Sequence, residues 1–275
     1  MSSKDSLGDR MKSYEDVYRT SLPIRMPVII RIDGKAFHSY TRGCKKPVDQ
    51  GLVDCMNETA KFLCENIQGC QIAYVQSDEI SLLLNNYKDV HTQSWFDNNI
   101  QKMVSISASM ASVTFTQNSW RIWVPEELDP GSDPMSPCDF CEPAYFDSRV
   151  FVLPKEEVSN YFLWRQQDAT RNSVQMLARS LYSHKECTDK NNSELQEMCF
   201  QKGVNWNNCP TSQKRGRCIV KTKIWKQGVN PQNGNTYMAQ RTEWVVDNEI
   251  PIFSQDRKYI NQYVFDEKKE QEVTL

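Results

Sequence analysis

Three short apolar runs in the first third of the chain predict strands that meet at acidic turns. Residues 28–32 are mostly apolar and lead directly to Asp33. Residues 72–75 lead to Asp78, and residues 80–84 lead away from it. Runs of this length that are bounded by turn residues are typical of buried strands. We therefore expect the second and third runs to form a hairpin with an acidic turn.

Two amphipathic segments separate and follow these strands. Apolar residues recur at helical spacing from Asp49, which suits an N-cap, to Gly69. A second helical pattern, rich in small residues, runs from Ile100 to Thr114. The order strand, helix, strand, strand, helix is the beginning of a ferredoxin-type unit. It predicts a mixed α/β (α+β) fold: a palm-like antiparallel sheet of β-α-β-β-α-β order with helices on one face.

The second half of the chain begins with a break in the pattern. Residues 125–143 hold five prolines and several acids, which indicates an irregular insertion. Residues 145–154 return to strand character, and residues 156–182 form a long helical pattern. Residues 188–213 are polar and Asn-rich, so we expect loops with short turns there.

A late hairpin completes the pattern, because residues 219–225 and 240–246 both alternate between apolar and polar side chains. We expect a palm-like catalytic domain over residues 1–155. Residues 156–275 then form a helical and hairpin elaboration that packs on the palm in one compact unit.

The composition limits the function classes. At 275 residues with a net charge of −2, the chain can bury a substantial core but does not coat nucleic acid by bulk charge. Its polar N-terminus resembles no signal peptide, and no apolar run is long enough to span a bilayer. We expect a cytoplasmic protein without membrane contact.

In a reducing compartment the ten cysteines are thiols or metal ligands, and most lie in apolar settings typical of small buried side chains. Cys138 and Cys141 have the spacing of half a zinc site. Two thiols alone do not complete a tetrahedral site, so we do not expect zinc there.

The two acidic turns are the candidate chemistry. If their strands are neighbours, Asp33 and Asp78 converge, and carboxylates in that arrangement suit Mg²⁺, which takes substrate phosphates as further ligands. Each turn also has a purely structural interpretation, since Asp-Gly is a common turn pair and a solvated hairpin tip can carry Ser77-Asp78-Glu79. A basic loop directly after Asp33 favours a metal and triphosphate site.

Several ordered blocks together resemble the tRNA(His) guanylyltransferase superfamily. They are Arg31 to His38, Lys46-Pro47, Ala73 to Ser81, Phe146 to Val150, Trp164 to Asp168 and Asp189-Lys190-Asn191. The match runs from about Met26 to about Trp225. The resemblance implies a polymerase-like palm that adds nucleotides to the 5′ end of tRNA in the 3′-to-5′ direction, with ATP and GTP as substrates.

The resemblance also implies roles for individual residues. Asp33, Asp78 and Glu79 would be catalytic, and two Mg²⁺ ions would be held by Asp33, Asp78 and the carbonyl of Gly34. The expected nucleotide and triphosphate contacts are Gly34, Lys35, Ala36, Phe37, His38, Lys46, Ser77 and Lys102. For His38, packing of the loop is an equally good interpretation.

Two departures from the family pattern bear on the subgroup. Enzymes that add the extra guanylate to eukaryotic tRNA(His) carry His-Ile-Asn-Asn where this chain has Thr170 and the residues after it. The stretch resembles the Thg1-like proteins of bacteria and archaea, which are implicated in templated repair of 5′-truncated tRNA. A basic family position is Asn99 here. Addition of guanylate to tRNA(His) remains the alternative.

Local basic residues are the candidate RNA contacts. Arg165 and Arg171 lie on the long predicted helix, and Lys190 lies in the Asn-rich region. A further group beside the late strands consists of Lys214, Arg215, Arg217, Lys221 and Lys223. The last group can equally form a solvated face. Trp164 is expected in the core rather than as a stacking platform for a base.

Two other functions fit part of the pattern. A nucleotide cyclase also pairs acids on a palm, and a non-catalytic RNA-binding protein could retain a relic palm. The blocks beginning at Trp164 and Asp189 disfavour a cyclase. Intact clustered acids disfavour a relic, because like charges repel unless a metal is bound. Family members are usually tetramers built as dimers of dimers, so we expect a homotetramer.

Overall fold

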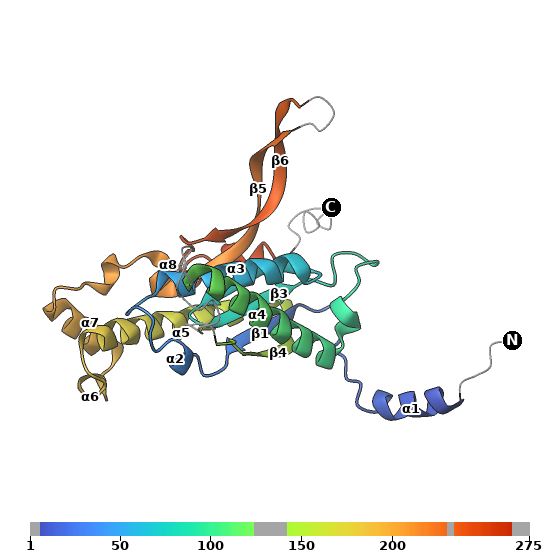
Figure 1. The fold of residues 1–275 in the computed structure, drawn as a ribbon, viewed down its shortest axis with the longest axis horizontal. Helices are drawn as coiled ribbons and strands as arrows, with labels where there is room; N and C mark the ends of the chain where they lie inside the picture. The colour runs from blue at the N-terminus through green and yellow to red at the C-terminus, as the bar shows by residue number, and fades with distance from the viewer. Residues whose placement is uncertain (1–5, 124–141, 230–233, 266–275) are drawn as a thin grey trace, which may run out of the picture.

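A six-stranded antiparallel sheet forms the centre of the molecule (Figure 1). A computed structural model of the protein describes residues 6–123, 142–229 and 234–265. The strands follow the order β4-β1-β3-β2-β5-β6. They are β1 (Val28–Gly34), β2 (Cys70–Gln76), β3 (Glu79–Leu84), β4 (Phe146–Val152), β5 (Arg217–Val229) and β6 (Thr236–Asp247). This confirms the predicted mixed fold. Cys138 and Cys141, and most of the predicted insertion, lie outside the described residues.

The two strands that carry the acids are neighbours. Strand β1 pairs with β3 so that Asp33 lies opposite Glu79, and with β4 so that Asp33 lies opposite Asp147. The backbone N–H of Gly34 donates to the carbonyl of Asp78 over 3.1 Å. The pairing brings both acidic turns to one end of the sheet, as the sequence predicts.

Helices α3 (Gln50–Asn66) and α4 (Ile100–Trp123) cover one face of the sheet. The Asp49 carboxylate caps α3 by accepting from the N–H of Leu52 over 3.2 Å. Apolar residues of α3 and α4 pack on strand residues such as Ile30 and Leu82. Both predicted helices are present, although α4 continues well past the end of its predicted pattern.

The long helix α5 (Lys155–Leu181), which the sequence analysis placed in the C-terminal elaboration, covers the opposite face. Phe162 of α5 packs with Ile29 and Tyr74, which alternate with the residues that face α3. The reason is visible in the strands, whose apolar runs are continuous. Strands of this kind are apolar on both faces and must be covered on both.

The Asn-rich region is more helical than the sequence analysis expected. It contains α6 (His184–Cys187), α7 (Asn192–Gln201), α8 (Thr211–Arg215) and the 3-10 turn η2 (Trp206–Asn208). Asn191 and Glu194 form a capping box at the start of α7. Leu195 and Cys199 then pack against α5. The prediction of loops was wrong because an asparagine that caps a helix has the same local signature as one in a turn.

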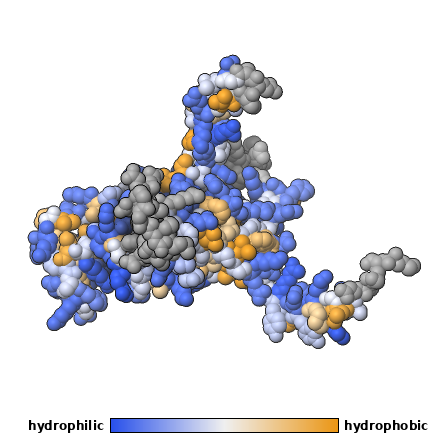
Figure 2. Space-filling view, in the orientation of Figure 1, coloured by the Kyte–Doolittle hydropathy of each residue, from blue (hydrophilic) through white to orange (hydrophobic). Residues whose placement is uncertain are grey.

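The late hairpin is confirmed and longer than expected. Strands β5 and β6 pair from Cys218–Asp247 to Val229–Thr236, but β5 pairs with β2 only as far as Val220. The remainder projects from the body as an arm (Figures 1 and 2). The hairpin therefore extends the sheet at its edge instead of packing on it.

Four short elements complete the described fold: α1 (Ser6–Asp16), α2 (Phe37–Tyr40), η1 (Trp95–Asn98) and α9 (Lys258–Asn261). Helix α1 lies apart from the body and has no buried residue (Figure 1). Within the described ranges, every helix is too short or too polar to cross a membrane.

Candidate active site

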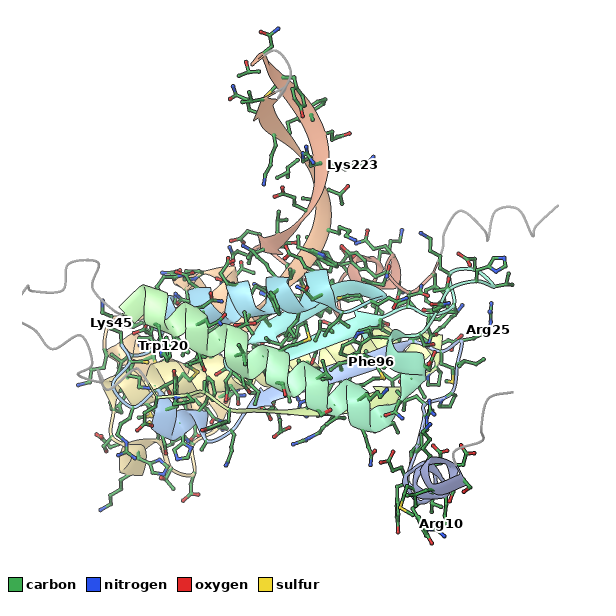
Figure 3. All side chains as sticks on the ribbon, turned by 45° about the vertical axis from the view of Figure 1, so that its right-hand side comes forward. Arg10, Arg25, Lys45, Phe96, Trp120 and Lys223 are labelled. Carbon is green, nitrogen blue, oxygen red and sulfur yellow. The ribbon has the colours of Figure 1, made fainter. Side chains whose placement is uncertain are left out.

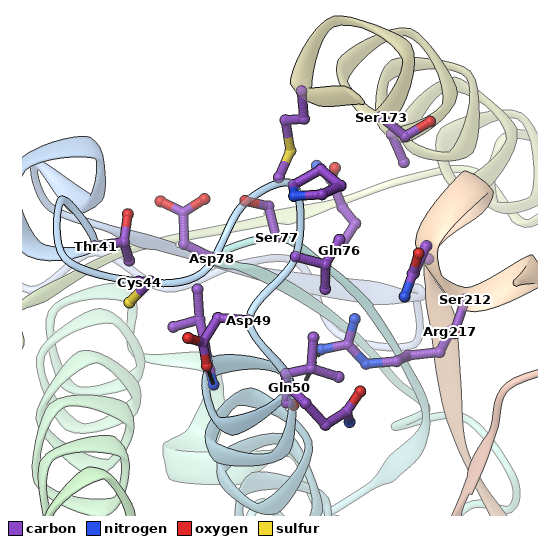
Figure 4. Close-up of a pocket in the computed structure, with 18 of the residues that line it drawn as sticks. Thr41, Cys44, Asp49, Gln50, Gln76, Ser77, Asp78, Ser173, Ser212 and Arg217 are labelled. Atoms are coloured by element: carbon purple, nitrogen blue, oxygen red, sulfur yellow. Dashed lines mark hydrogen bonds between the residues drawn. The ribbon is translucent and has the colours of Figure 1, made fainter. Parts of the chain in front are cut away.

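A cavity of about 1120 Å³ opens beside the acidic turn of the β2–β3 hairpin (Figure 4). Its wall is formed by the loop after β1, the first turns of α3, the Ser77-Asp78 turn, α5 and α8. Cavities of several hundred Å³ hold drug-sized ligands, so this one has room for a nucleoside triphosphate and the end of a second substrate.

Both turns at the cavity are held in left-handed backbone conformations. Ala36 has φ 54° and Ser77 has φ 47°, which side chains other than glycine rarely adopt. At Gly34 the chain passes so close to the ring of Phe37 that an added Cβ would lie 2.3 Å from it. Phe37 is buried between Tyr40, Phe115 and Phe146. The aromatic cluster therefore holds the loop after Asp33 in a tight, fixed course.

Asp78 lines this cavity with an uncompensated charge. Burial raises the pKa of its carboxyl, hydrogen bonds from Ser77 and its own backbone lower it, and the nearby Asp33 raises it further. Across the described residues, no lysine, arginine or histidine lies within 4.0 Å of the Asp78 carboxylate. Asp33 does not line the cavity, and Nη2 of Arg31 lies 3.5 Å from its Oδ2. The two repelling carboxylates, with no basic partner at Asp78, are a donor set that suits a divalent cation.

A protein-only metal cage is absent from the described ranges, where no three His, Cys, Asp or Glu side chains are grouped to hold an ion. The pair formed by Asp33 and Asp78 is smaller than such a cage. Mg²⁺ is usually bound by one or two carboxylates, with substrate phosphates and waters as its other ligands. The acid pair is therefore compatible with Mg²⁺ and unsuited to a metal that needs an all-protein site.

Glu79 was expected beside the metal ligands, and it lies opposite Asp33 on the neighbouring strand, where Arg31 contacts both carboxylates. The side chain is buried under α5 and does not line the cavity. Arg165 donates to both of its oxygens over 2.7 Å, and Nη2 of Arg31 lies 2.8 Å from Oε2. Burial raises the pKa of Glu79, and Arg165 opposes that shift. Consecutive residues of a strand point to opposite faces, so Asp78 and Glu79 have different environments.

The same ion pair corrects the expectation for Arg165. Only 4% of this residue is exposed, and its guanidinium is bound by Glu79 and by Asp168 over 3.0 Å. It therefore does not present a free cation to RNA. Trp164 was expected in the core, but it is 49% exposed and its ring lies 4.5 Å from the Arg165 guanidinium carbon. Its surface position makes it available for stacking.

Most predicted nucleotide contacts lie on the cavity wall. They are Gly34, Ala36, Phe37, His38, Lys46 and Ser77. Lys35 points away, with its ammonium 5.9 Å from the ring of Tyr145. Lys102 is also absent from the wall, because it lies in the first turn of α4 beside η1. Figure 3 shows Phe96 of η1 and Trp120 at opposite ends of α4, with Lys45 on the side of Trp120.

Three of the predicted RNA contacts converge on a second cavity, of about 640 Å³, between α5 and α8. Arg171, Lys214 and Arg215 line it together with two tryptophans, Trp164 and Trp206. Lys190 is not part of it and lies 3.9 Å from Glu194 at the start of α7. Lys221 and Lys223 are exposed on the arm (Figure 3).

The structure adds site residues that the sequence analysis missed or misplaced. Arg179 of α5 and Asn57 of α3 line the large cavity. Arg217 was expected at a contact with RNA or on a solvated face, but it is 4% exposed and also lines that cavity. The alternation along β5 carries the signal, because Arg217 lies on the same strand face as the buried Ile219.

Comparison with known proteins assigns the chain and its fold to one enzyme family. The model of the tRNAHis guanylyltransferase family matches residues 8–154. The chain belongs to the tRNAHis guanylyltransferase family. Members of this family are nucleotidyltransferases that act on the 5′ ends of tRNA. The resemblance stated from the sequence is thereby confirmed.

Individual relatives agree with this assignment. A bacterial tRNA(His) guanylyltransferase (Thg1)-like protein in complex with ATP is 45% identical, with 95% of this chain and 100% of the other chain covered and a TM-score of 0.79. A bacterial protein of the same description in complex with GTP is 44% identical, with the same coverage and a TM-score of 0.76. A probable tRNA(His) guanylyltransferase of Drosophila melanogaster is 26% identical over 72% of this chain and 68% of its own length.

Proposed function

We propose that the protein is a Mg²⁺-dependent 3′-to-5′ nucleotidyltransferase that extends the 5′ end of tRNA in a template-dependent way and repairs 5′-truncated tRNA. The observation that carries the proposal is the convergence of Asp33 and Asp78 beside a cavity of nucleotide size. An alternative within the same family is untemplated addition of guanylate to tRNA(His).

Nucleotide binding is supported by the cavity and by the relatives. The two bacterial proteins that match this chain along their full length were solved with ATP and with GTP. On the cavity wall of this chain, His38 and Lys46 are exposed donors close to the acidic turn. Both side chains are placed to bind triphosphate oxygens. We propose that ATP or GTP activates the 5′ end of the tRNA before the incoming nucleotide attacks.

Asp33, Asp78 and the Gly34 carbonyl are the groups that would hold Mg²⁺. When bound, the metal lowers the pKa of an attacking hydroxyl and neutralises charge on the leaving pyrophosphate. The protein contributes the fixed course of the Asp33 loop, which Phe37 and its aromatic neighbours hold in place. It also contributes a partly enclosed wall of donors at which a triphosphate is oriented.

The second cavity is the proposed contact surface for tRNA. Arg171, Lys214 and Arg215 supply cations for phosphates, and Trp164 and Trp206 supply flat rings next to them. Aromatic and basic side chains in one groove are the combination that binds unpaired RNA. Helix α5 borders both cavities, since Ser173 lines the large one and Thr170 the second. RNA held in the second cavity would therefore lie next to the nucleotide site.

The choice between templated and untemplated addition depends on Thr170. The family resemblance places a histidine there in enzymes that add the extra guanylate. In this chain the Thr170 hydroxyl donates to the Gln166 carbonyl over 2.9 Å, so it is engaged within its own helix. Without an imidazole at this place, base pairing to the opposite strand is the remaining source of nucleotide choice.

The test is an extension assay on a tRNA that lacks its first nucleotide, with each nucleoside triphosphate offered separately. We expect incorporation only of the nucleotide complementary to the template. Asp33→Ala and Asp78→Ala should each abolish addition while tRNA affinity is retained, because neither carboxylate lies in the second cavity.

Asp89→Ala provides the matched control, since this exposed acid lies in the loop after β3 and should leave addition unchanged. Equal incorporation opposite every template base would contradict templated repair and favour the alternative. A cyclic product from ATP or GTP alone would indicate a cyclase. Full turnover in Asp78→Ala would eliminate the acid pair as the reaction centre.

A further inference from the structure

The wall of the large cavity contains a buried cation, Arg217, with no acid in direct contact among the described residues. Arg217 is 4% exposed, donates from Nε to the amide oxygen of Asn57 and donates from Nη2 to the Val53 carbonyl over 3.3 Å. Over the described part of the chain, no aspartate or glutamate lies within 4.0 Å of its guanidinium. Figure 4 shows the side chain extending from β5 among the residues that line the cavity.

Asn57 makes this part of the wall a surface of hydrogen-bond donors. The residue is buried in α3 and lines the same cavity as Arg217. Because its amide oxygen accepts from Arg217, the amide N–H₂ is the group left for another partner. The guanidinium also has more N–H donors than its two assigned acceptors use. A ligand with several acceptor oxygens matches this pair.

The charge of Arg217 is unfavourable in the protein alone. Burial lowers the pKa of the guanidinium to about 10, and the charge of Asp54, which is not in contact with it, opposes only part of that shift. The guanidinium is still protonated at neutral pH. A buried charge without a partner destabilises a fold, and a neutral side chain could make the same two hydrogen bonds to α3. The position therefore suits an anion that enters the cavity and supplies the missing negative charge.

We propose that Arg217 and Asn57 form a phosphate-binding subsite of the large cavity, separate from the acid pair at Asp33 and Asp78. The inference rests on the proposed function for the source of the phosphate, which is the triphosphate of the nucleotide or a phosphate of the tRNA end. A guanidinium binds phosphate oxygens through two parallel N–H donors, and the Asn57 amide adds another. Arg217 is thus a binding residue and not a reacting group.

Asn57→Asp tests the charge without removing the hydrogen bond. The substitution is nearly isosteric, keeps an acceptor for Nε of Arg217 and adds a carboxylate that neutralises the guanidinium. We expect ATP or the truncated tRNA, titrated separately by equilibrium binding, to bind about tenfold more weakly, as for loss of one charge-assisted contact. The melting temperature should not fall, since a buried ion pair replaces a lone charge.

Gln50→Glu is the matched control. Gln50 also lies on α3 and lines the cavity, but it contacts Asp54 and not Arg217. The variant adds the same charge to the same wall, so a change of less than about threefold is expected. An equal loss in both variants would show bulk repulsion and overturn the subsite.

The two ligands identify the source of the phosphate. If only ATP binds more weakly, the subsite binds the triphosphate of the nucleotide. If only tRNA binds more weakly, the subsite binds a phosphate of the tRNA end. Unchanged affinity for both overturns the proposal. If Asn57→Asp does not fold, Arg217→Gln is tested in its place. The same loss of affinity is expected, and unchanged affinity for both ligands again overturns the proposal. Binding is read without turnover, so its outcome is independent of the extension assay, which tests the proposed function.

Discussion

Individual side chains at this site have environments that their neighbours in the sequence do not share. Asp78 lines the cavity without a basic partner, and Glu79 next to it is held by Arg31 and Arg165. The free energy of unfolding should reflect this difference. A buried carboxylate with a like charge beside it destabilises the fold in its ionised form.

Asp78→Asn is therefore expected to raise the free energy of unfolding at pH 7, by about 1 kcal/mol, while it abolishes nucleotide addition. The folded-state pKa of Asp78 is raised above its unfolded value. Below the pKa of the unfolded chain, Asp78 is protonated in both states and does not lower the free energy of unfolding. As the pH rises through the folded-state pKa, the carboxyl ionises in the fold and its destabilising effect becomes complete. The advantage of the variant should shrink as the pH is lowered into the acidic range, as measured by urea unfolding.

Asp89→Asn is the opposite case. The backbone hydrogen bond from His91 is the main cause that lowers the pKa of Asp89. A lowered folded pKa stabilises the fold above the unfolded pKa, and this contribution is lost as pH falls. The variant should not gain stability at pH 7. A gain equal to that of Asp78→Asn would contradict the origin assigned to the effect.

At the scale of elements, the ion pairs between α5 and the sheet decide how the helix is held. Arg165 of α5 reaches Glu79 of β3, which Arg31 of β1 also contacts, so one buried cluster connects three elements. Arg171, two turns later on the same helix, pairs with Asp168 on the surface over 2.7 Å. The two arginines share a helix and a partner but differ in burial.

Arg165→Met should lower the free energy of unfolding by about 3 kcal/mol, because it leaves the buried Glu79 with only one of its two cations. Arg171→Met, the same substitution at the exposed pair, should cost about 0.5 kcal/mol. Urea unfolding of both variants measures the difference. Equal costs would show that the buried cluster does not hold α5 on the sheet.

At the scale of the whole molecule, α4 carries apolar side chains that are exposed among the residues that the structure describes. Exposed side chains recur every seven residues along the outer face of α4, at Ile106, Val113 and Trp120. This spacing places them in one stripe, as in helices that pack against another helix. We propose a second copy of the chain as the partner of this stripe within the homotetramer that the family resemblance implies.

Light scattering should give four times the mass of the chain. Val113→Glu should reduce that mass, since a charge in the middle of the stripe cannot be buried against a partner. Gln101→Glu, at an exposed position on another side of α4, is the control and should leave the mass unchanged. A monomeric wild-type protein contradicts the tetramer, and an unchanged mass in Val113→Glu excludes this stripe as the contact.

Much of the architecture was predictable because its signals are local. The N-cap at Asp49, the helical spacing after it and the apolar runs that end at Asp33 and Asp78 are each contained in a few residues. The errors arose where local signals are ambiguous. Asn191 has the same signature in a turn as in the cap of α7.

The sequence by itself determined the strands, the main helices and the position of the acids at the ends of neighbouring strands. Only the tertiary structure decided which charges face the cavity and which are bound inside. Glu79 meets Arg165 across 86 positions of the chain, and Arg217 meets Asn57 across 160. Burial and ion pairing between such distant residues depend on how the sheet and helices pack, and no pattern of neighbouring residues records that packing.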